Sequence, residues 1–150
     1  MSEAPKPEVI RLSLPSRLEL LSVLDRVSLS VCERMGFDED TTAQVGMGVV
    51  EAGTNAVQHG HKRDASLNFE IEFHMYADKL EIHVYDRGKG FDVQRVVPDV
   101  TTPEHLFDMR GRGIFIMRSC CDDVTFSFSD AGTHCVLVKN RPAGRIAADA

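Results

Sequence analysis

Residues 45–59, with the sequence VGMGVVEAGTNAVQH, constrain the fold more than any other stretch of this chain. Written on a helix, Glu51, Asn55 and His59 occupy every fourth position and form a single polar stripe. The apolar residues fall on a neighbouring stripe that suits packing on a sheet: Val45, Val49, Ala52 and Ala56. The pattern predicts a helix that packs on a sheet and also carries an unusual line of polar side chains.

Three glycines lie within the same segment, at positions 46, 48 and 53. Each glycine inside a helix costs about 1 kcal/mol relative to alanine, because glycine loses more backbone freedom on folding. Their presence indicates that something approaches the helix backbone closely. Either a sheet or a bound ligand would explain it.

Length and charge narrow the class of protein. The 150 residues are enough for one domain with a substantial core, and no apolar run is long enough to span a bilayer. The net charge of −6 argues against a nucleic-acid-binding surface. Residues 87–118 nevertheless hold six basic and four acidic residues, a local net charge of +2 that favours a small anionic ligand. Residues 1–7 lack the apolar core of a signal peptide, so we expect a cytoplasmic protein.

Sequence patterns predict the first elements of the chain. Hydrophobic alternation over residues 8–14 indicates a strand. Ser16, followed three residues later by Glu19, is a capping-box pattern, so a helix is expected to begin there and to end at Gly36. Asp38 is a suitable cap for the second helix, which contains the polar stripe.

The second half of the chain predicts two hairpins and one further helix. Residues 67–76 and 80–84 alternate around a short turn, which is typical of an antiparallel hairpin with one apolar face. An apolar helix over 111–121 precedes a second hairpin, 124–128 with 135–138. The predicted fold class is α+β: a two-layer α/β sandwich in which about three helices cover one face of a mixed, mostly antiparallel sheet.

We expect a single domain over residues 8–140, with a disordered tail at 1–7 and a flexible tail at 141–150. Residues 93–110 contain two prolines and show no sustained periodicity. A connection this long in a compact domain is usually a lid or a binding loop, and we expect one here.

Other residues with reactive or bulky side chains receive simpler interpretations. The cysteines form no C-x-x-C motif and are expected to be buried as small apolar side chains: Cys32, Cys120, Cys121 and Cys135. Most histidines form no ligand pattern, so no zinc site is expected: His61, His74, His83, His105 and His134. Three further residues are expected in core and lid packing: Met109, Phe115 and Met117.

Two glycine motifs add to the polar stripe. Asp-x-Gly-x-Gly at residues 86–90 follows a predicted strand, and Gly-x-Gly at 111–113 opens a predicted helix. Taken alone, the first is more often a turn and the second just as often a tight helix entry. The nearby cations either neutralise phosphate or are simply solvated: Lys89, Arg110 and Arg112. His59 has a functional and a structural interpretation of equal weight. The order and spacing of the stripe and the two motifs carry more information than any one of them.

These segments resemble the N, G1, G2 and final Gly-Thr boxes of the GHKL ATPase superfamily, at residues 51–59, 86–92, 111–118 and 132–133. The short form with E-A-x-x-N-A-V and G-R-G-I is similar to the bacterial anti-sigma-factor serine/threonine kinases. The resemblance extends from about residue 8 to 139 and implies a Bergerat, or histidine-kinase-like, ATPase fold. Gly53 departs from the family pattern, in which valine or cysteine is commoner.

The resemblance implies a role for each matching residue. Asn55 would bind Mg²⁺ through its amide oxygen, and Glu51, one turn earlier, would accept a proton from the attacking hydroxyl as the catalytic base. Asp86 would accept a hydrogen bond from the amino group of adenine. Backbone glycines, a cation and a threonine would complete the ATP contacts: Gly88, Gly90, Gly111, Gly113, Arg112 and Thr133.

The implied function is that of an anti-sigma-factor-like serine/threonine protein kinase that uses ATP and Mg²⁺. It would phosphorylate a serine or threonine of an anti-sigma-factor antagonist protein while sequestering a sigma factor or a similar regulator, and the family implies a homodimer. A non-catalytic ATP-binding switch that traps a regulatory partner uses the same pocket residues and remains the alternative. A detached histidine-kinase domain is disfavoured, because no dimerisation helix with a phosphoacceptor histidine precedes residue 8. A gyrase-type ATPase would need a longer lid and a transducer domain.

Overall fold

The computed structural model describes residues 6–62, 64–87 and 109–142. Within them, five strands form one sheet: β1 (Glu8–Pro15), β2 (Asn68–Met75), β3 (Lys79–Asp86), β4 (Asp123–Ser129) and β5 (Gly132–Asn140). Their spatial order is β1-β2-β3-β5-β4, and each of the four pairings is antiparallel. The two predicted hairpins are β2–β3 and β4–β5, and both are confirmed.

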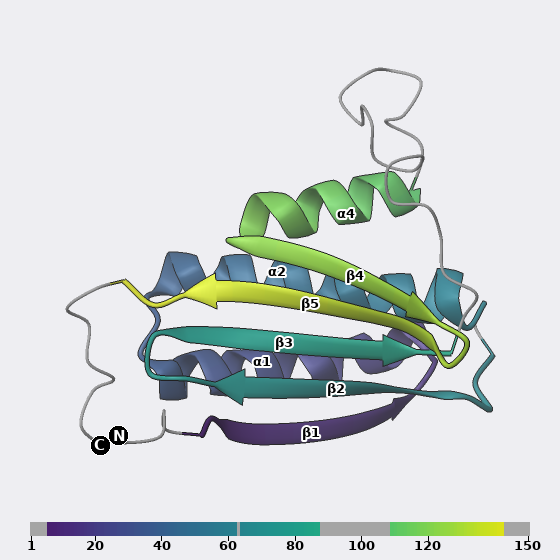
Figure 1. Ribbon diagram of the computed structural model, residues 1–150, viewed down its shortest axis with the longest axis horizontal. Helices are drawn as coiled ribbons and strands as arrows, with labels where there is room; N and C mark the ends of the chain where they lie inside the picture. The colour runs from purple at the N-terminus through teal and green to yellow at the C-terminus, as the bar shows by residue number, and fades with distance from the viewer. Residues whose placement is uncertain (1–5, 63, 88–108, 143–150) are drawn as a thin grey trace.

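The helices lie on one face of this sheet (Figure 1). They are a 3₁₀ turn η1 (Leu18–Leu20), α1 (Leu21–Met35), α2 (Glu39–Asn55), a π-helical turn η2 (Ala56–Gly60) and α4 (Met109–Cys120). The α+β two-layer fold class is therefore confirmed, and the described sheet is antiparallel throughout instead of mixed. No helix in these described ranges has both the length and the apolarity needed to cross a membrane.

The connection from β1 to α1 differs from the prediction. The first helical turn has no side-chain cap, so the capping box predicted at Ser16 is wrong. The Ser16 hydroxyl is hydrogen-bonded with Nδ1 of His61 instead. The other helix signals are confirmed: Gly36 ends α1 in the left-handed conformation, with φ 73°, and Asp38 accepts the backbone N–H of Thr41 at 2.8 Å.

Helix α2 packs on the sheet through the predicted apolar stripe, whose members are at most 3% exposed: Val45, Val49, Ala52 and Ala56. Its interior glycines accommodate protein neighbours. A Cβ at Gly53 would lie 2.7 Å from Leu21 of α1, and a Cβ at Gly48 would lie 3.0 Å from the sulfur of Cys121. Close packing against neighbouring side chains, and not a ligand, therefore explains these two glycines.

Predictions for the remaining side chains are confirmed in part. All four cysteines are buried and free. Met117 is fully buried, whereas Phe115 is 45% exposed and is therefore not a core residue. The predicted lid over 93–110 was too long by two residues, because residues 109 and 110 belong to α4. Residues 93–108 and the side chains of Met109 and Arg110 lie outside what the structure describes.

Candidate functional site

One end of the site is a contact between α2 and α4. A Cβ at position 113 would lie 3.0 Å from Oε2 of Glu51, so Gly113 allows the carboxylate to approach the α4 backbone. Helix α4 begins at Met109, two residues before the predicted start, so the Gly-x-Gly motif lies inside the helix. Gly111 belongs to the first turn, whose backbone N–H groups have no partner within the helix, whereas Gly113 lies beyond it. Both glycines are buried.

The environment of Glu51 alters its acidity. Burial raises the pKa of Glu51 above 4.5, and the positive charge of Arg112 opposes this shift. A carboxylate with a raised pKa holds a proton more strongly, which suits a general base. The exposed Arg112 side chain thus interacts with the carboxylate predicted to be catalytic.

The other end of the site is formed by Gly60 and Asp86. A Cβ at Gly60 would lie 2.5 Å from the carboxyl carbon of Asp86, so these two residues are in direct contact. Asp86 is the last residue of β3, and Gly60 is the last residue of the π-helical turn that extends α2. The turn places its final residue against the carboxylate, and π-helical turns are often found at functional sites.

The β4–β5 hairpin completes the surroundings of Asp86. Thr133 is buried and pairs with Asp86 in the β3–β5 register. Gly132 has a φ of 133°, and a Cβ there would overlap the carbonyl oxygen of Asp86 at 1.8 Å. Only glycine can occupy this position beside the end of β3, which explains the glycine of the Gly-Thr pair in physical terms.

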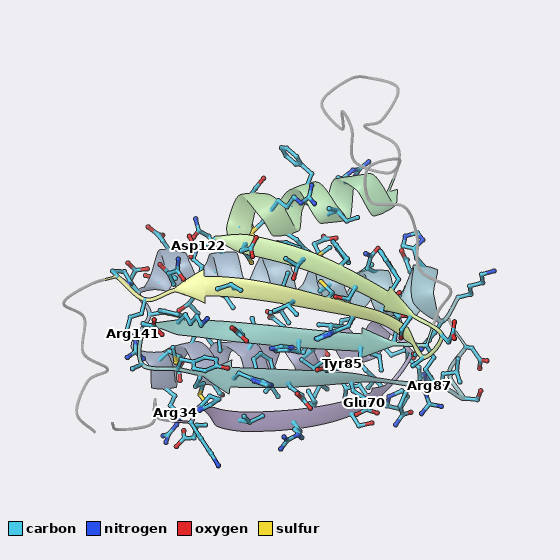
Figure 2. All side chains as sticks on the ribbon, viewed as in Figure 1. Arg34, Glu70, Tyr85, Arg87, Asp122 and Arg141 are labelled. Atoms are coloured by element: carbon cyan, nitrogen blue, oxygen red, sulfur yellow. The ribbon has the colours of Figure 1, made fainter. Side chains whose placement is uncertain are left out.

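His61, whose role the sequence interpretation missed, forms a hydrogen bond with the backbone directly after β3. Its Nε2 accepts the backbone N–H of Arg87 at 2.8 Å, directly after Asp86 (Arg87 is labelled in Figure 2). Because Nε2 is the acceptor, Nδ1 carries the proton of the neutral ring and donates to the hydroxyl of Ser16. Burial lowers the pKa of His61, which favours this neutral form. The local sequence gives no signal for a contact between residues so far apart.

The polar stripe of α2 joins these two ends. Glu51 faces Gly113, Asn55 ends α2, and Gly60 meets Asp86, so one continuous helical segment connects the two glycine motifs. Gly60 lies nine positions after Glu51, which corresponds to roughly 13 Å along a helix at 1.5 Å per residue. Asn55 and His59 are half-buried along this segment. Gly88, Lys89 and Gly90, also predicted for the site, lie outside the described residues.

A mostly apolar cavity of about 650 Å³ opens beside Glu51. It lies between α1 and α2, and residues of both helices and of α4 line it, among them Leu29, Met47 and Ile116. Met47 is 55% exposed and Leu29 is 46% exposed. The cavity gives a neighbouring molecule access to the carboxylate from the helical side.

Fold and site geometry together fit an ATPase domain built on the polar stripe of one amphipathic helix. A family model described as histidine kinase-like ATPase domain matches residues 14–139, and the chain belongs to this family. Membership implies the use of ATP.

Relatives and a solved structure agree with this family. The serine-protein kinase RsbW of Listeria innocua is 35% identical over 136 residues, which cover 87% of this chain and 85% of that protein. The Bacillus subtilis protein of the same name is 32% identical over 122 residues, covering 78% and 76% of the two chains. The crystal structure of the RsbU and RsbW domains of a Mycobacterium tuberculosis protein matches with a TM-score of 0.66 at 16% identity. It covers 91% of this chain and 34% of that one, and it supports the fold.

Proposed function

We propose that this chain is an ATP-dependent serine/threonine protein kinase of the anti-sigma-factor type. It phosphorylates a serine or threonine of an antagonist protein and, in another complex, sequesters a sigma factor or a similar regulator. The relatives named serine-protein kinase support the activity. The single observation that carries the proposal is Glu51, a carboxylate of raised pKa that contacts the glycine motif of α4.

In the proposed mechanism, the residues of the chain position the nucleotide and move one proton. Glu51 accepts the proton of the acceptor hydroxyl while that oxygen attacks the γ-phosphorus of ATP; the bond from this phosphorus to the bridging oxygen breaks, and ADP leaves. Asp86 accepts a hydrogen bond from the amino group of adenine, which selects adenine over guanine. Backbone N–H groups in the first turn of α4 bind phosphate oxygens.

The donor set fits a magnesium ion. Asn55 and Glu51 lie one turn apart on α2 and offer amide and carboxylate oxygens, the hard ligands that Mg²⁺ prefers. Asn55 would hold the ion. When bound, Mg²⁺ would neutralise charge on the phosphates. Arg112, next to Glu51, adds a further positive charge at this end of the site.

The cavity beside Glu51 supports a protein substrate. The acceptor hydroxyl must reach the catalytic base, and Glu51 lines this cavity. We therefore expect the phosphoacceptor segment of the antagonist to enter between α1 and α2 and contact apolar residues such as Met47 there. The proposal also includes a homodimer and a cytoplasmic location, as the family resemblance implies.

Phosphoryl transfer to the cognate antagonist protein tests the proposal. Glu51→Gln removes the base but keeps the shape of the side chain, and we expect transfer to fall by about 100-fold or more while ATP still binds. Glu33→Gln, an exposed change on α1, serves as the matched control and should transfer like the wild type. Undiminished phosphoryl transfer in Glu51→Gln would refute the proposed role of Glu51 as the catalytic base. Absent transfer in the wild type, with tight ATP-dependent partner binding, would replace the kinase by the non-catalytic switch.

A further inference from the structure

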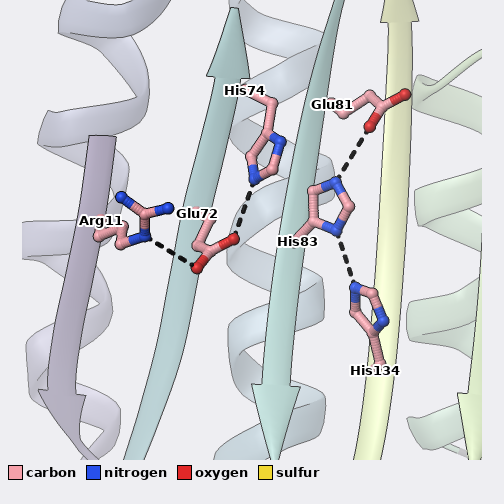
Figure 3. Close-up of polar contacts among 6 residues, drawn as sticks. All are labelled: Arg11, Glu72, His74, Glu81, His83 and His134. Carbon is pink, nitrogen blue, oxygen red and sulfur yellow. Dashed lines mark hydrogen bonds and ion pairs between the residues drawn. The ribbon is translucent and has the colours of Figure 1, made fainter. Parts of the chain in front are cut away.

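The outer face of the sheet carries a polar cluster for which the proposed kinase has no use. All described helices lie on the opposite face (Figure 1). The cluster comes from three adjacent strands, β2, β3 and β5, and consists of Glu72, His74, Glu81, His83 and His134 (Figure 3). Three histidines and two carboxylates stay together on this face although four of these side chains are only 14–23% exposed.

Strand register brings three of these residues to one point. His74 on β2 lies directly opposite Glu81 on β3, and His83 follows two residues later on the same face. The ligand atoms of the three side chains all lie within 4.8 Å of one another. Three donors bound tetrahedrally to zinc are roughly 3.4 Å apart, so small side-chain rotations suffice to bring them to an ion.

Hydrogen bonds to the other atoms of these side chains orient them for metal binding. His74 Nε2 is 2.9 Å from Oε1 of Glu72, so the ring donates its Nε2–H to the carboxylate and Nδ1 keeps a lone pair that can bind a metal ion. Figure 3 shows the second ring nitrogen of His74 on the side of His83. The carboxylate of Glu72 is itself held by Arg11 at 3.2 Å.

His83 and Glu81 are supported in the same way. His83 Nε2 is 3.0 Å from Oε1 of Glu81. These two atoms and Nδ1 of His74 are the three that would bind a metal ion. His83 Nδ1 is 2.8 Å from Nε2 of His134. When Nε2 binds an ion, Nδ1 keeps its proton and donates a hydrogen bond to Nε2 of His134. Lys79 holds the second oxygen of Glu81 at 3.0 Å.

We infer that His74, Glu81 and His83 form a zinc-binding site on the outer face of the sheet. Two imidazole nitrogens and one carboxylate oxygen suit Zn²⁺, whereas Mg²⁺ prefers oxygen ligands alone. The fourth position stays open to water. The bound ion cross-links β2 to β3. This inference departs from the sequence-based expectation that these histidines form no ligand set, because the register of β2 and β3 brings together residues that are not close in the sequence.

Calorimetric titration of the full chain with ZnCl₂ tests this site. The wild type should bind one Zn²⁺ per chain, and its melting temperature should rise with Zn²⁺ but not with Mg²⁺. His83→Ala and the near-isosteric Glu81→Gln should each weaken Zn²⁺ binding more than about 100-fold, and Glu72→Gln by about 10-fold. Glu70→Gln, an exposed change on the same strand and face as Glu72, should bind Zn²⁺ like the wild type.

Three outcomes would overturn the site: wild-type protein that does not bind Zn²⁺, unchanged binding in Glu81→Gln, or one ion per two chains. Substitution with Co²⁺ separates this site from the cysteines. The absorption spectrum should lack a thiolate charge-transfer band, and a strong thiolate band would move the ion to the cysteines and refute the assignment. None of these measurements depends on ATP.

Discussion

Replacing Gly60 by alanine tests its contact with Asp86, the residue proposed to bind adenine. The new Cβ would lie 2.5 Å from the carboxyl carbon of Asp86 and 2.6 and 2.7 Å from its two oxygens. Ordinary contacts are near 3.4 Å or more, so the carboxylate must move. Gly60 is helical and does not have a positive φ, so alanine brings no backbone strain. The fold should survive while Asp86 loses its position.

The size of the effect follows from the hydrogen bond that Asp86 makes in the proposal. A hydrogen bond to a charged group contributes about 1.5–3 kcal/mol, and each 1.4 kcal/mol corresponds to about tenfold in affinity. We therefore expect Gly60→Ala to weaken ATP binding by about 10- to 100-fold in calorimetry. Gly46→Ala is the matched control on the same helical segment, because its Cβ would meet only the side-chain oxygen of Asp25, at 3.1 Å.

A double-mutant cycle tests whether the loss of ATP affinity in Gly60→Ala is caused by displacement of Asp86. In an Asp86→Ala background, adding Gly60→Ala should cost little further affinity, since no carboxylate remains to be displaced. If Gly60→Ala binds ATP as tightly as the wild type, or costs as much in the Asp86→Ala background, the reasoning about this contact is refuted.

Three further substitutions test the packing of α2, the contact of His61 after β3 and the cavity beside Glu51. Gly53→Ala places a Cβ 2.7 Å from a methyl group of Leu21, so overpacking should lower the free energy of unfolding by about 1–3 kcal/mol in urea, despite better helix propensity. The pKa of His61 is lowered from 6.5 by burial, so the native state favours the neutral ring. The contribution of His61 to stability is therefore present above pH 6.5 and is lost as the pH falls below that value. Urea unfolding of His61→Gln on both sides of pH 6.5 should show a smaller pH dependence than the wild type, and an equal dependence would contradict this. Met47→Asp should reduce transfer to the antagonist by about tenfold without changing ATP affinity, and unchanged transfer would place the acceptor elsewhere.

Local signals in the sequence were sufficient for most of the fold. Gly36 ends α1 and Asp38 caps α2 because each acts on its own backbone within a few residues. The apolar and polar faces of α2 could also be predicted, because the helical period alone places Val49 on the core side and Glu51 on the polar side.

Contacts between distant segments could not be predicted in this way. Ser16 has the chemistry of a helix cap, yet its hydroxyl lies beside His61, 45 residues further on, and tertiary structure overrides the local preference. The same holds for His74 and His83, which are brought together by the pairing of β2 with β3. The exposure of Phe115 could not be predicted, because an aromatic residue in an apolar helix does not reveal which face of the helix it occupies.

The central claim is that Glu51, Asn55 and Asp86 engage one adenine nucleotide. Its most direct test is parallel calorimetric titration of the wild type with ATP and with GTP, both in the presence of Mg²⁺. The account predicts one ATP bound per chain and GTP binding at least about tenfold weaker, with the preference abolished in Asp86→Ala. Wild-type protein that binds neither nucleotide, or both equally, would contradict it.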